Sequence, residues 1–163
     1  MDQNKFMQLA LQMAAKAFEA GEVPVGAVIV RRIDGKIIAK AHNLVESKQS
    51  PIKHAEIIAL NIASKKLKTK YLQDCDLYVT LEPCPMCASA ISMYRLGRLY
   101  FGAKDPKFGA VESVTNFFAS KNCFHKPDIY SGLYEENVTL LMKNFFRIIR
   151  DQKKLGERRC CSL

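Results

Sequence analysis

The amino-acid sequence predicts a single α/β domain with three layers, in which a sheet of about five strands lies between helices. Three observations support this fold class. Short apolar segments typical of strands alternate along the chain with segments of helical periodicity. The length of 163 residues is that of one compact domain able to bury a core. A content of 48% hydrophobic and 25% charged residues is that of ordinary globular proteins.

The first predicted elements are a helix and a hairpin. Apolar side chains in residues 6–18 recur three and four positions apart, which predicts one buried stripe of a helix that Gly21 ends. Residues 25–30 form a continuous apolar run and predict a buried strand. Residues 37–41 predict its hairpin partner, because the Asp-Gly pair at 34–35 is a turn sequence.

A second helix and a further strand follow. Residues 42–50 are polar and predict a loop. Ser50 and Pro51 resemble an N-cap and a first-turn proline, so we expect a helix over residues 52–67. This segment is apolar on most sides, which is typical of a helix buried between layers. Residues 77–81 predict the next strand.

The second half of the chain continues the alternation. The expected elements are a helix that begins after the proline-rich segment 82–86 and ends at 94, a strand at 99–101, a charged loop at 104–109, a short helix at 114–120, at most a short strand at 129–130, and a long terminal helix at 135–154. We assign the domain to residues 1–150. Residues 151–163 form a basic C-terminal tail that we expect to fray.

The chain is strongly basic, with 25 Lys and Arg against 16 Asp and Glu and a formal net charge of +9. This charge indicates a polyanion as partner, nucleic acid first and an anionic membrane second, unless it only keeps the protein soluble. The start of the chain lacks a secretory signal, and no segment reaches a membrane-spanning length of apolar residues, so we expect a cytoplasmic protein without a membrane partner. Residues 160–163 formally fit a prenylation signal, but their two middle positions are not aliphatic, and we expect no lipid anchor.

One histidine and two cysteines have the spacing of a catalytic zinc site. His54, Cys84 and Cys87 supply one imidazole and two thiolates, which are ligands that zinc prefers. Three ligands leave the fourth position of a tetrahedral ion to water, whose pKa zinc lowers towards about 7. Cysteines three apart at a helix start lie on one face, and the helix N-terminus favours their thiolates. Glu56 is next to this position as a proton carrier, so we expect one Zn²⁺ per subunit.

Each motif alone is weak. A Cys-x-x-Cys in a cytosolic chain can be a redox pair, and a lone His-Ala-Glu is more often an ordinary helix start. A non-catalytic zinc module, with Cys75 or Cys123 as fourth ligand, is another alternative, although it needs no proton carrier. The spacing also leaves one point open. Helix positions two apart differ by about 200° around the axis, so the sequence does not aim His54 and Glu56 at the same water.

The motif in full is that of the cytidine deaminase superfamily, His-x-Glu followed by Pro-Cys-x-x-Cys, and the chain resembles its family of bacterial tRNA adenosine deaminases. The likeness runs from about residue 6 to 150 and includes Asn43 and the segments 22–27, 77–83, 101–105 and 145–147. It implies a three-layer α/β/α cytidine deaminase-like fold with a mixed sheet. It also implies a homodimer and the conversion of adenosine to inosine at the wobble position of a tRNA anticodon.

The expected mechanism combines this resemblance with the chemistry of the motif. A zinc-bound hydroxide attacks the amino-bearing carbon, while Glu56 takes the water proton, passes it to the ring nitrogen and finally protonates the leaving ammonia. Because stacking in a duplex hides this carbon, we expect the substrate to be an anticodon stem-loop whose adenine is splayed into the site.

The resemblance also implies residues that contact the substrate: Asn43, Ala55, Asp105, Lys107, Phe145 and Arg147. Asn43 is assigned to the target nucleoside, and Asp105 with its loop to the neighbouring anticodon nucleotides. Both can instead be plain turn residues. An aromatic side chain at helical spacing, such as Phe145, is more often core than a stacking platform, and Arg147 can belong to an ordinary exposed helix face.

The nearest rival function is deamination of a free nucleobase or nucleoside, guanine or cytosine, by the same zinc chemistry. Such a substrate does not call for a net charge of +9 or for salt-sensitive affinity. The chain departs from the pattern of the family it resembles at Pro85, Met93 and Phe108. Phe108 could alter RNA contacts, which leaves the exact tRNA open.

Overall fold

The computed structural model describes residues 2–160, and the side chains of residues 2–154. The described residues form a five-stranded sheet whose strands are β1 (Gly26–Arg31), β2 (Lys36–His42), β3 (Cys75–Leu81), β4 (Arg98–Ala103) and β5 (Asp128–Tyr130). In space the strands lie in the order β2-β1-β3-β4-β5. Each predicted strand is present, and its ends lie within two residues of those expected.

The sheet is mixed because its two halves are connected differently. β1 pairs antiparallel with β2 through the predicted turn, where Gly35 has a φ of +65°, and antiparallel with β3 on its other side. β3, β4 and β5 are parallel to one another. Parallel neighbours need a crossover, and α3 (Pro85–Met93) supplies it between β3 and β4. The mixed sheet of about five strands is thus confirmed.

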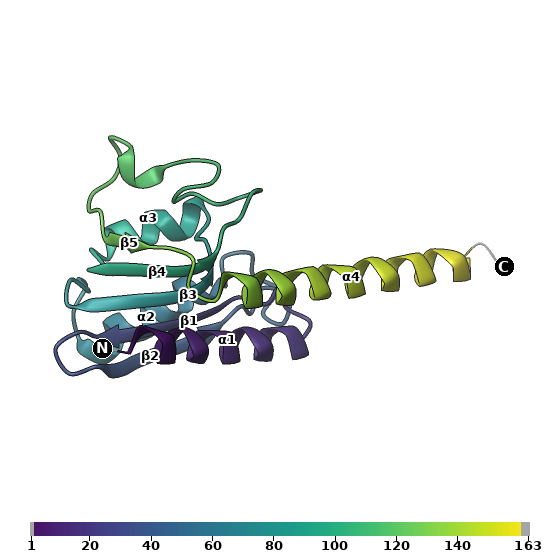
Figure 1. Cartoon of the computed structure of the whole chain (residues 1–163), viewed down its shortest axis with the longest axis horizontal. Helices are drawn as coiled ribbons and strands as arrows, with labels where there is room; N and C mark the ends of the chain where they lie inside the picture. Colours follow the sequence, from purple (N-terminus) through teal and green to yellow (C-terminus); the bar gives the residue numbers. More distant parts are fainter. Residues whose placement is uncertain (1, 161–163) are drawn as a thin grey trace.

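Alternate residues of each strand point into two separate cores, which is the two-residue period of a sheet covered on both faces. One core lies beneath α2 (Ala55–Leu67) and α3 and includes the strand residues Ala27, Ile29, Leu77, Val79, Leu99 and Phe101. The other lies beneath α1 (Gln3–Glu19) and includes Val28, Val30, Tyr78 and Tyr100. Figure 1 shows these helices on opposite faces of the sheet, so the three predicted layers are confirmed.

The strand directions bring several connecting segments to one edge of the sheet. β3, β4 and β5 end at this edge because they are parallel, while antiparallel β1 begins there and β2 ends there. The segments that leave or enter the edge are residues 43–54, residues 82–84, residues 104–109 and the start of α4 (Glu135–Cys160). In open α/β sheets the carboxyl ends of the strands are where ligands bind.

Two predicted helices differ from the observed ones. α2 begins at Ala55 and not at residue 52, and Pro51 lies in a turn whose Ser50 carbonyl oxygen accepts a hydrogen bond from the Lys53 N–H at 3.1 Å. The expected Ser50 N-cap was wrong because serine and proline begin turns as readily as helices. Residues 114–120 contain only a three-residue 3-10 helix, η1 (Phe117–Ala119).

α4 is longer than predicted and projects from the body of the molecule (Figure 1). Its first turns contact β4 and α1, and the helix then continues to Cys160, past the expected boundary at residue 150. Fraying of residues 151–163 stays a prediction. The sequence at 160–163 that resembles a prenylation signal lies outside the residues whose side chains are described. Within residues 2–160, no helix combines the length and apolar character needed to cross a membrane.

Candidate metal centre and active site

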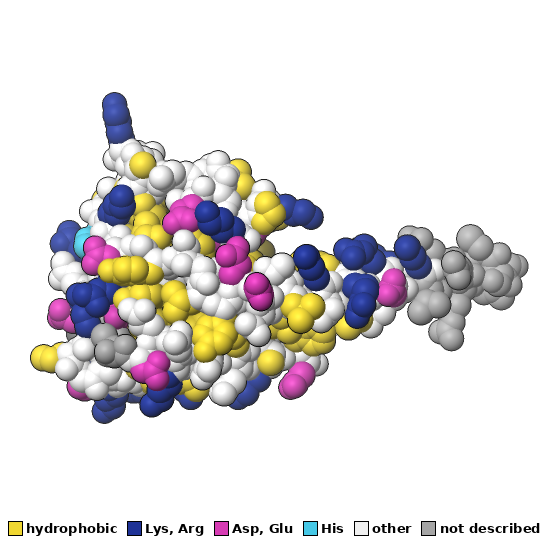
Figure 2. Space-filling model, viewed as in Figure 1, with side chains coloured by type: hydrophobic (Ala, Val, Ile, Leu, Met, Phe, Trp, Pro, Cys, Tyr) yellow, Lys and Arg dark blue, Asp and Glu magenta, His cyan; other side chains and the backbone are white. Residues whose placement is uncertain are grey.

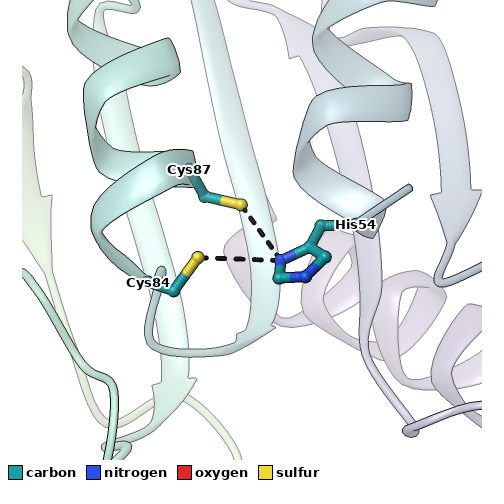
Figure 3. A group of neighbouring side chains, drawn as sticks. All are labelled: His54, Cys84 and Cys87. Atoms are coloured by element: carbon teal, nitrogen blue, oxygen red, sulfur yellow. Dashed lines mark hydrogen bonds between the residues drawn. The ribbon is translucent and has the colours of Figure 1, made fainter. Parts of the chain in front are cut away.

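The three predicted metal ligands meet at the edge of the sheet where β3, β4 and β5 end and where α2 and α3 begin (Figure 3). His54 is the N-cap residue of α2, Cys84 is the N-cap residue of α3, and Cys87 lies in the first turn of α3. His54 Nδ1 faces both sulfur atoms, at 3.6 Å from Cys84 Sγ and 3.5 Å from Cys87 Sγ. All three ligand atoms lie within 4.8 Å of one another.

The donor set and its spacing fit a zinc ion. A tetrahedral ion with a Zn–N distance of about 2.0–2.1 Å and a Zn–S distance of about 2.3 Å holds nitrogen and sulfur ligands about 3.6 Å apart. The observed N···S distances of 3.5 and 3.6 Å meet this requirement. Among the described residues, no fourth His, Cys, Asp or Glu donor joins the group. A tetrahedral ion held by these three residues would therefore keep one position for water, as in catalytic zinc sites.

Cys75 and Cys123 lie away from this group, so neither completes a four-ligand structural site. Cys75 is buried at the start of β3, the opposite end from the metal centre, and burial raises its pKa to about 11. Cys123 Sγ lies 3.5 Å from Ser92 Oγ and donates to the carbonyl oxygen of His125 at 3.2 Å. These contacts argue against the non-catalytic zinc module.

The two cysteines at the metal centre differ in acidity because they share a hydrogen bond. Donation from Cys87 lowers the pKa of Cys84 to about 4, and His54 lowers it further against the effect of burial. The same bond with Cys84, together with burial, raises the pKa of Cys87. A divalent cation held between them favours the thiolate of both side chains.

Glu56 lies against the same cluster. Glu56 is 4% exposed, and its carboxyl group lies close enough to Cys84, Cys87 and His54 for their charges and dipoles to act on its pKa. Burial raises the pKa of Glu56 to about 7, where a carboxyl group both accepts and releases protons at neutral pH. The start of α2 explains the orientation that the sequence left open. His54 precedes the helix with φ −73° and ψ 149°, so the 200° rotation between interior helix positions does not separate it from Glu56.

Asn43 holds the start of α2 in position. Its Oδ1 accepts a hydrogen bond from the Ala55 N–H at 2.9 Å, and its Nδ2 donates to the Val23 carbonyl oxygen at 3.0 Å. The Ala55 amide is one of the first-turn donors that no helix carbonyl accepts, so this bond replaces a missing cap. Asn43 is 6% exposed and the Ala55 side chain is fully buried. Contact of either residue with a nucleoside stays a prediction.

Sequence reasoning missed the role of Glu82, which lies between β3 and Cys84 and is 2% exposed. Its Oε1 accepts the N–H groups of Val111, Glu112 and Ser113 at 3.0, 2.7 and 3.0 Å. Its Oε2 accepts the Asp105 N–H at 3.0 Å and the Ser113 hydroxyl. Burial alone would raise the pKa of Glu82, but these hydrogen bonds outweigh it and lower the pKa. The available signals were its position at the end of a buried strand and its place in segment 77–83 of the resemblance.

The loop after β4 carries two of the predicted substrate contacts. Asp105 Oδ1 accepts the N–H groups of Lys107 at 2.9 Å and Phe108 at 3.2 Å, so Asp105 is a turn residue whatever else it does. Lys107 is exposed, and Phe108 is 67% exposed. Lys104 forms an ion pair with Glu112 at 3.2 Å. Contact of Asp105 and Lys107 with RNA stays a prediction.

The aromatic pair of α4 divides between core and surface. Phe145 is 6% exposed and packs edge-on against Phe18 of α1, with 5.6 Å between the ring centroids. Phe145 is therefore a core residue, which is one of the two alternatives that the sequence left open. Little of its ring is accessible to a base. Phe146, whose centroid is 5.4 Å from that of Phe145, is 42% exposed. Arg147 is exposed, and its contact with RNA stays a prediction.

Comparisons with known proteins identify close relatives. The chain is 56% identical over 145 residues to the tRNA-specific adenosine deaminase of Rickettsia bellii (strain RML369-C), which covers 89% of this chain and 100% of the relative. A solved structure from a study of A-to-I editing by tRNA:A34 deaminases superposes with a TM-score of 0.81 and 49% identity, over 84% of this chain and 98% of that one. The guanine deaminase from Bacillus subtilis superposes with a TM-score of 0.62 and 33% identity, over 74% and 87%.

The fold and the site together define a class of protein. A three-ligand metal group with a buried carboxylate beside it, at the carboxyl edge of a mixed sheet, is the arrangement of a metal-dependent deaminase. The sequence pattern of the MafB19-like deaminase family matches residues 1–150. The chain belongs to this family and, within it, to the tRNA-specific adenosine deaminases.

Proposed function

We propose that the protein is a zinc-dependent enzyme that hydrolyses adenosine to inosine at the wobble position of a tRNA anticodon. The observation that carries the proposal is the group of His54, Cys84 and Cys87 with the Glu56 carboxyl group against it. The N···S distances, which match a tetrahedral zinc ion, support the choice of metal. The identity of 56% to a tRNA-specific adenosine deaminase supports the choice of substrate.

The side chains of the site have separate chemical tasks. His54, Cys84 and Cys87 hold the zinc ion, which supplies an acidified water molecule as the nucleophile. Glu56 accepts a proton from this water and delivers it to the ring nitrogen beside the amino-bearing carbon. It then takes the proton of the newly added hydroxyl group and gives it to the amino group, so that the carbonyl group forms as the C–N bond breaks and ammonia leaves. Adenosine and water thus become inosine and ammonia, and a Glu56 pKa of about 7 suits a group that is alternately base and acid.

The remaining predicted residues contact the RNA around the reacting base. Asn43 and Ala55, at the start of α2, contact the target nucleoside. Asp105 and Lys107, on the loop that Glu82 holds, contact the neighbouring anticodon nucleotides. The enzyme acts as a homodimer in the cytoplasm, where its tRNA substrate is found.

The projecting part of α4 carries a row of basic side chains (Figure 2). Lys143, Arg147, Arg150 and Lys154 are exposed and follow one another at intervals of four, three and four residues. This spacing puts them on one side of the helix along about 17 Å of its axis. A regular row of cations on a helix suits the phosphates of an RNA backbone. We assign Arg147 and its three neighbours in this row to the phosphates of the anticodon stem.

The test of the proposal uses the full chain loaded with zinc and three kinds of substrate. We expect inosine to form in an anticodon stem-loop with a wobble adenosine, little or none in a fully paired RNA of the same sequence, and no turnover of free guanine or cytosine. Glu56→Gln should keep one zinc per chain and lose about 10²- to 10⁴-fold in rate, the usual contribution of a general acid–base group. Glu19→Gln, an exposed change on α1, is the matched control.

Two results of this experiment would contradict the proposal. Turnover of free guanine without inosine in the stem-loop would favour a guanine deaminase, a second candidate that the similarity to the Bacillus subtilis enzyme motivates. Near-normal activity of Glu56→Gln with stoichiometric zinc would remove Glu56 from its role.

A further inference from the structure

We infer that Phe108 is a stacking subsite for the unpaired base next to the target adenosine, an inference that rests on the proposed function. Phe108 is 67% exposed on the loop that follows β4. A large aromatic ring in water at this level of exposure contributes little to the core. Three features of its surroundings, namely a rigid loop, attachment to the metal centre and flanking positive charge, indicate an unpaired nucleobase as its partner.

The loop fixes the backbone at Phe108. Asp105 Oδ1 accepts the Phe108 N–H at 3.2 Å, and the Asp105 carbonyl oxygen accepts the Gly109 N–H at 2.9 Å. Gly109 leaves no room for a side chain, because a Cβ atom there would lie 2.5 Å from that carbonyl oxygen and 2.5 Å from the carboxyl carbon of Glu82. The backbone on both sides of Phe108 is thus fixed. A fixed backbone lowers the conformational entropy that is lost when a base stacks on the ring, because only the side-chain torsions remain to be ordered.

The same loop is attached directly to the metal centre. The Ala110 N–H donates to the Pro83 carbonyl oxygen at 2.9 Å, and Pro83 immediately precedes the metal ligand Cys84. The Glu82 carboxylate makes a second attachment through the Asp105 N–H. Phe108 is two residues from Ala110, and two residues span at most about 7 Å. The ring therefore lies close enough to the metal centre to meet a nucleotide adjacent to the one in the site.

The chemistry around Phe108 suits a nucleotide better than an apolar protein surface. Lys104 and Lys107 belong to the same loop, and Lys107 is exposed with no ion pair among the described residues. An aromatic ring with nearby cations matches the base and phosphate of one nucleotide, as in proteins that bind single-stranded nucleic acid. An anticodon loop offers unpaired bases on both sides of the wobble position. One of them can stack on Phe108 while the target base occupies the site.

The molecule provides a matched control for this inference. Phe124 is 76% exposed and also has lysines close in sequence, at 121 and 126. It lies on the segment between η1 and β5, and the described hydrogen bonds of that segment run to Ser92 and Leu96 in and after α3, not to the metal loop. If any exposed phenylalanine among lysines strengthens RNA binding, Phe124→Ala should weaken binding as much as Phe108→Ala does. If Phe108 is a specific stacking subsite, only Phe108→Ala should weaken it.

The experiment measures single-turnover deamination of an anticodon stem-loop by Phe108→Ala, Phe108→Leu, Phe108→Trp and Phe124→Ala. For Phe108→Ala we expect the half-saturating enzyme concentration to rise about 5- to 150-fold, the range of one base–aromatic stack. The maximal rate should change much less, because Phe108 does not touch the reacting atoms. Phe108→Leu should resemble Phe108→Ala, while Phe108→Trp and Phe124→Ala should stay near wild type.

A second set of RNAs tests which partner the ring contacts. Stem-loops with an abasic nucleotide on the 5′ or the 3′ side of the wobble adenosine are compared with the complete loop. One of these two RNAs lacks the base that stacks on Phe108. On that RNA the wild type and Phe108→Ala should bind equally weakly. A difference that persists on both abasic RNAs would overturn the inference, and so would full binding by Phe108→Ala or Phe108→Leu.

The outcomes separate this inference from the proposed function. If the wild type makes inosine and Phe108→Ala binds the stem-loop normally, the subsite is wrong and the function stands. If the wild type makes no inosine in any stem-loop, the proposed function itself fails. A shift of Phe108→Ala from dimer to monomer in light scattering would mean that the ring contacts a second copy of the chain, which also overturns the inference.

Discussion

Replacing Glu82 by glutamine tests how the loop beside the metal centre is held. The carboxylate accepts four backbone N–H groups and one hydroxyl, all from residues 105–113. Glutamine has nearly the same shape but one oxygen fewer, and its amide group donates hydrogen bonds. Glu82→Gln therefore puts a donor where the structure needs an acceptor, without creating a cavity.

The size of the effect follows from the individual bonds. If the remaining oxygen keeps the three amides at Oε1, the Asp105 N–H loses its acceptor and faces the new amide group. An unpaired buried donor costs about 1–3 kcal/mol, and the three surviving bonds lose their charge assistance. We expect the free energy of unfolding to fall by about 2–4 kcal/mol, less than the usual total for a domain, so the chain still folds.

Urea denaturation and amide hydrogen exchange measure this change. Exchange should accelerate at Asp105, Val111 and Glu112, whose N–H groups point at the carboxylate, and deamination should slow because the loop opens beside the site. The control is Glu112→Gln, which removes the partly exposed ion pair with Lys104 and should cost at most about 1 kcal/mol. Equal stability and equal exchange in the two variants would refute the reasoning.

The pH dependence of the stability of the wild type and of Glu82→Gln gives an independent check. The pKa of Glu82 is lowered below its ordinary value of 4.5, so its stabilising contribution is present above pH 4.5 and is lost as the pH falls through the folded-state pKa. The stability difference between wild type and Glu82→Gln should be constant above pH 5 and shrink below about pH 4.5. A difference that grows on acidification would contradict the assignment.

Three further changes test the loop after β4, the start of α2 and the basic row on α4. Gly109→Ala puts a Cβ atom against Glu82 Oε2, so we expect the free energy of unfolding in urea to fall by about 1–3 kcal/mol and deamination to slow. Wild-type stability and activity would mean that the loop shifts easily to make room. Asn43→Ala leaves the Ala55 N–H without its acceptor and should destabilise the fold by about 1–3 kcal/mol. The variant should also lose zinc to a chelator more readily, and unchanged zinc retention would mean that Asn43 does not support the metal centre. Arg147→Ala should lower the salt slope of log K for the stem-loop by about one, and an unchanged slope would remove this side chain from the phosphates.

The sequence by itself predicted most of the secondary-structure elements and the residues that gather at the candidate site. All five strands lie within two residues of their predicted ends, because an apolar run between turn residues is a local signal. The sequence also predicted that His54, Cys84 and Cys87 gather at one site, since one imidazole and two thiolates are a donor set that few other functions require. Glu56 followed from its position beside them.

The tertiary structure decided how these groups are aimed and what supports them. The sequence began α2 too early, so it could not explain how His54 and Glu56 reach one cluster. It gave no role to Glu82, because the amides that this carboxylate accepts come from a loop more than twenty residues away. It could not separate buried Phe145 from exposed Phe146 either. In each case the deciding contact joins segments distant in the chain, and a local pattern carries no information about how such segments approach each other.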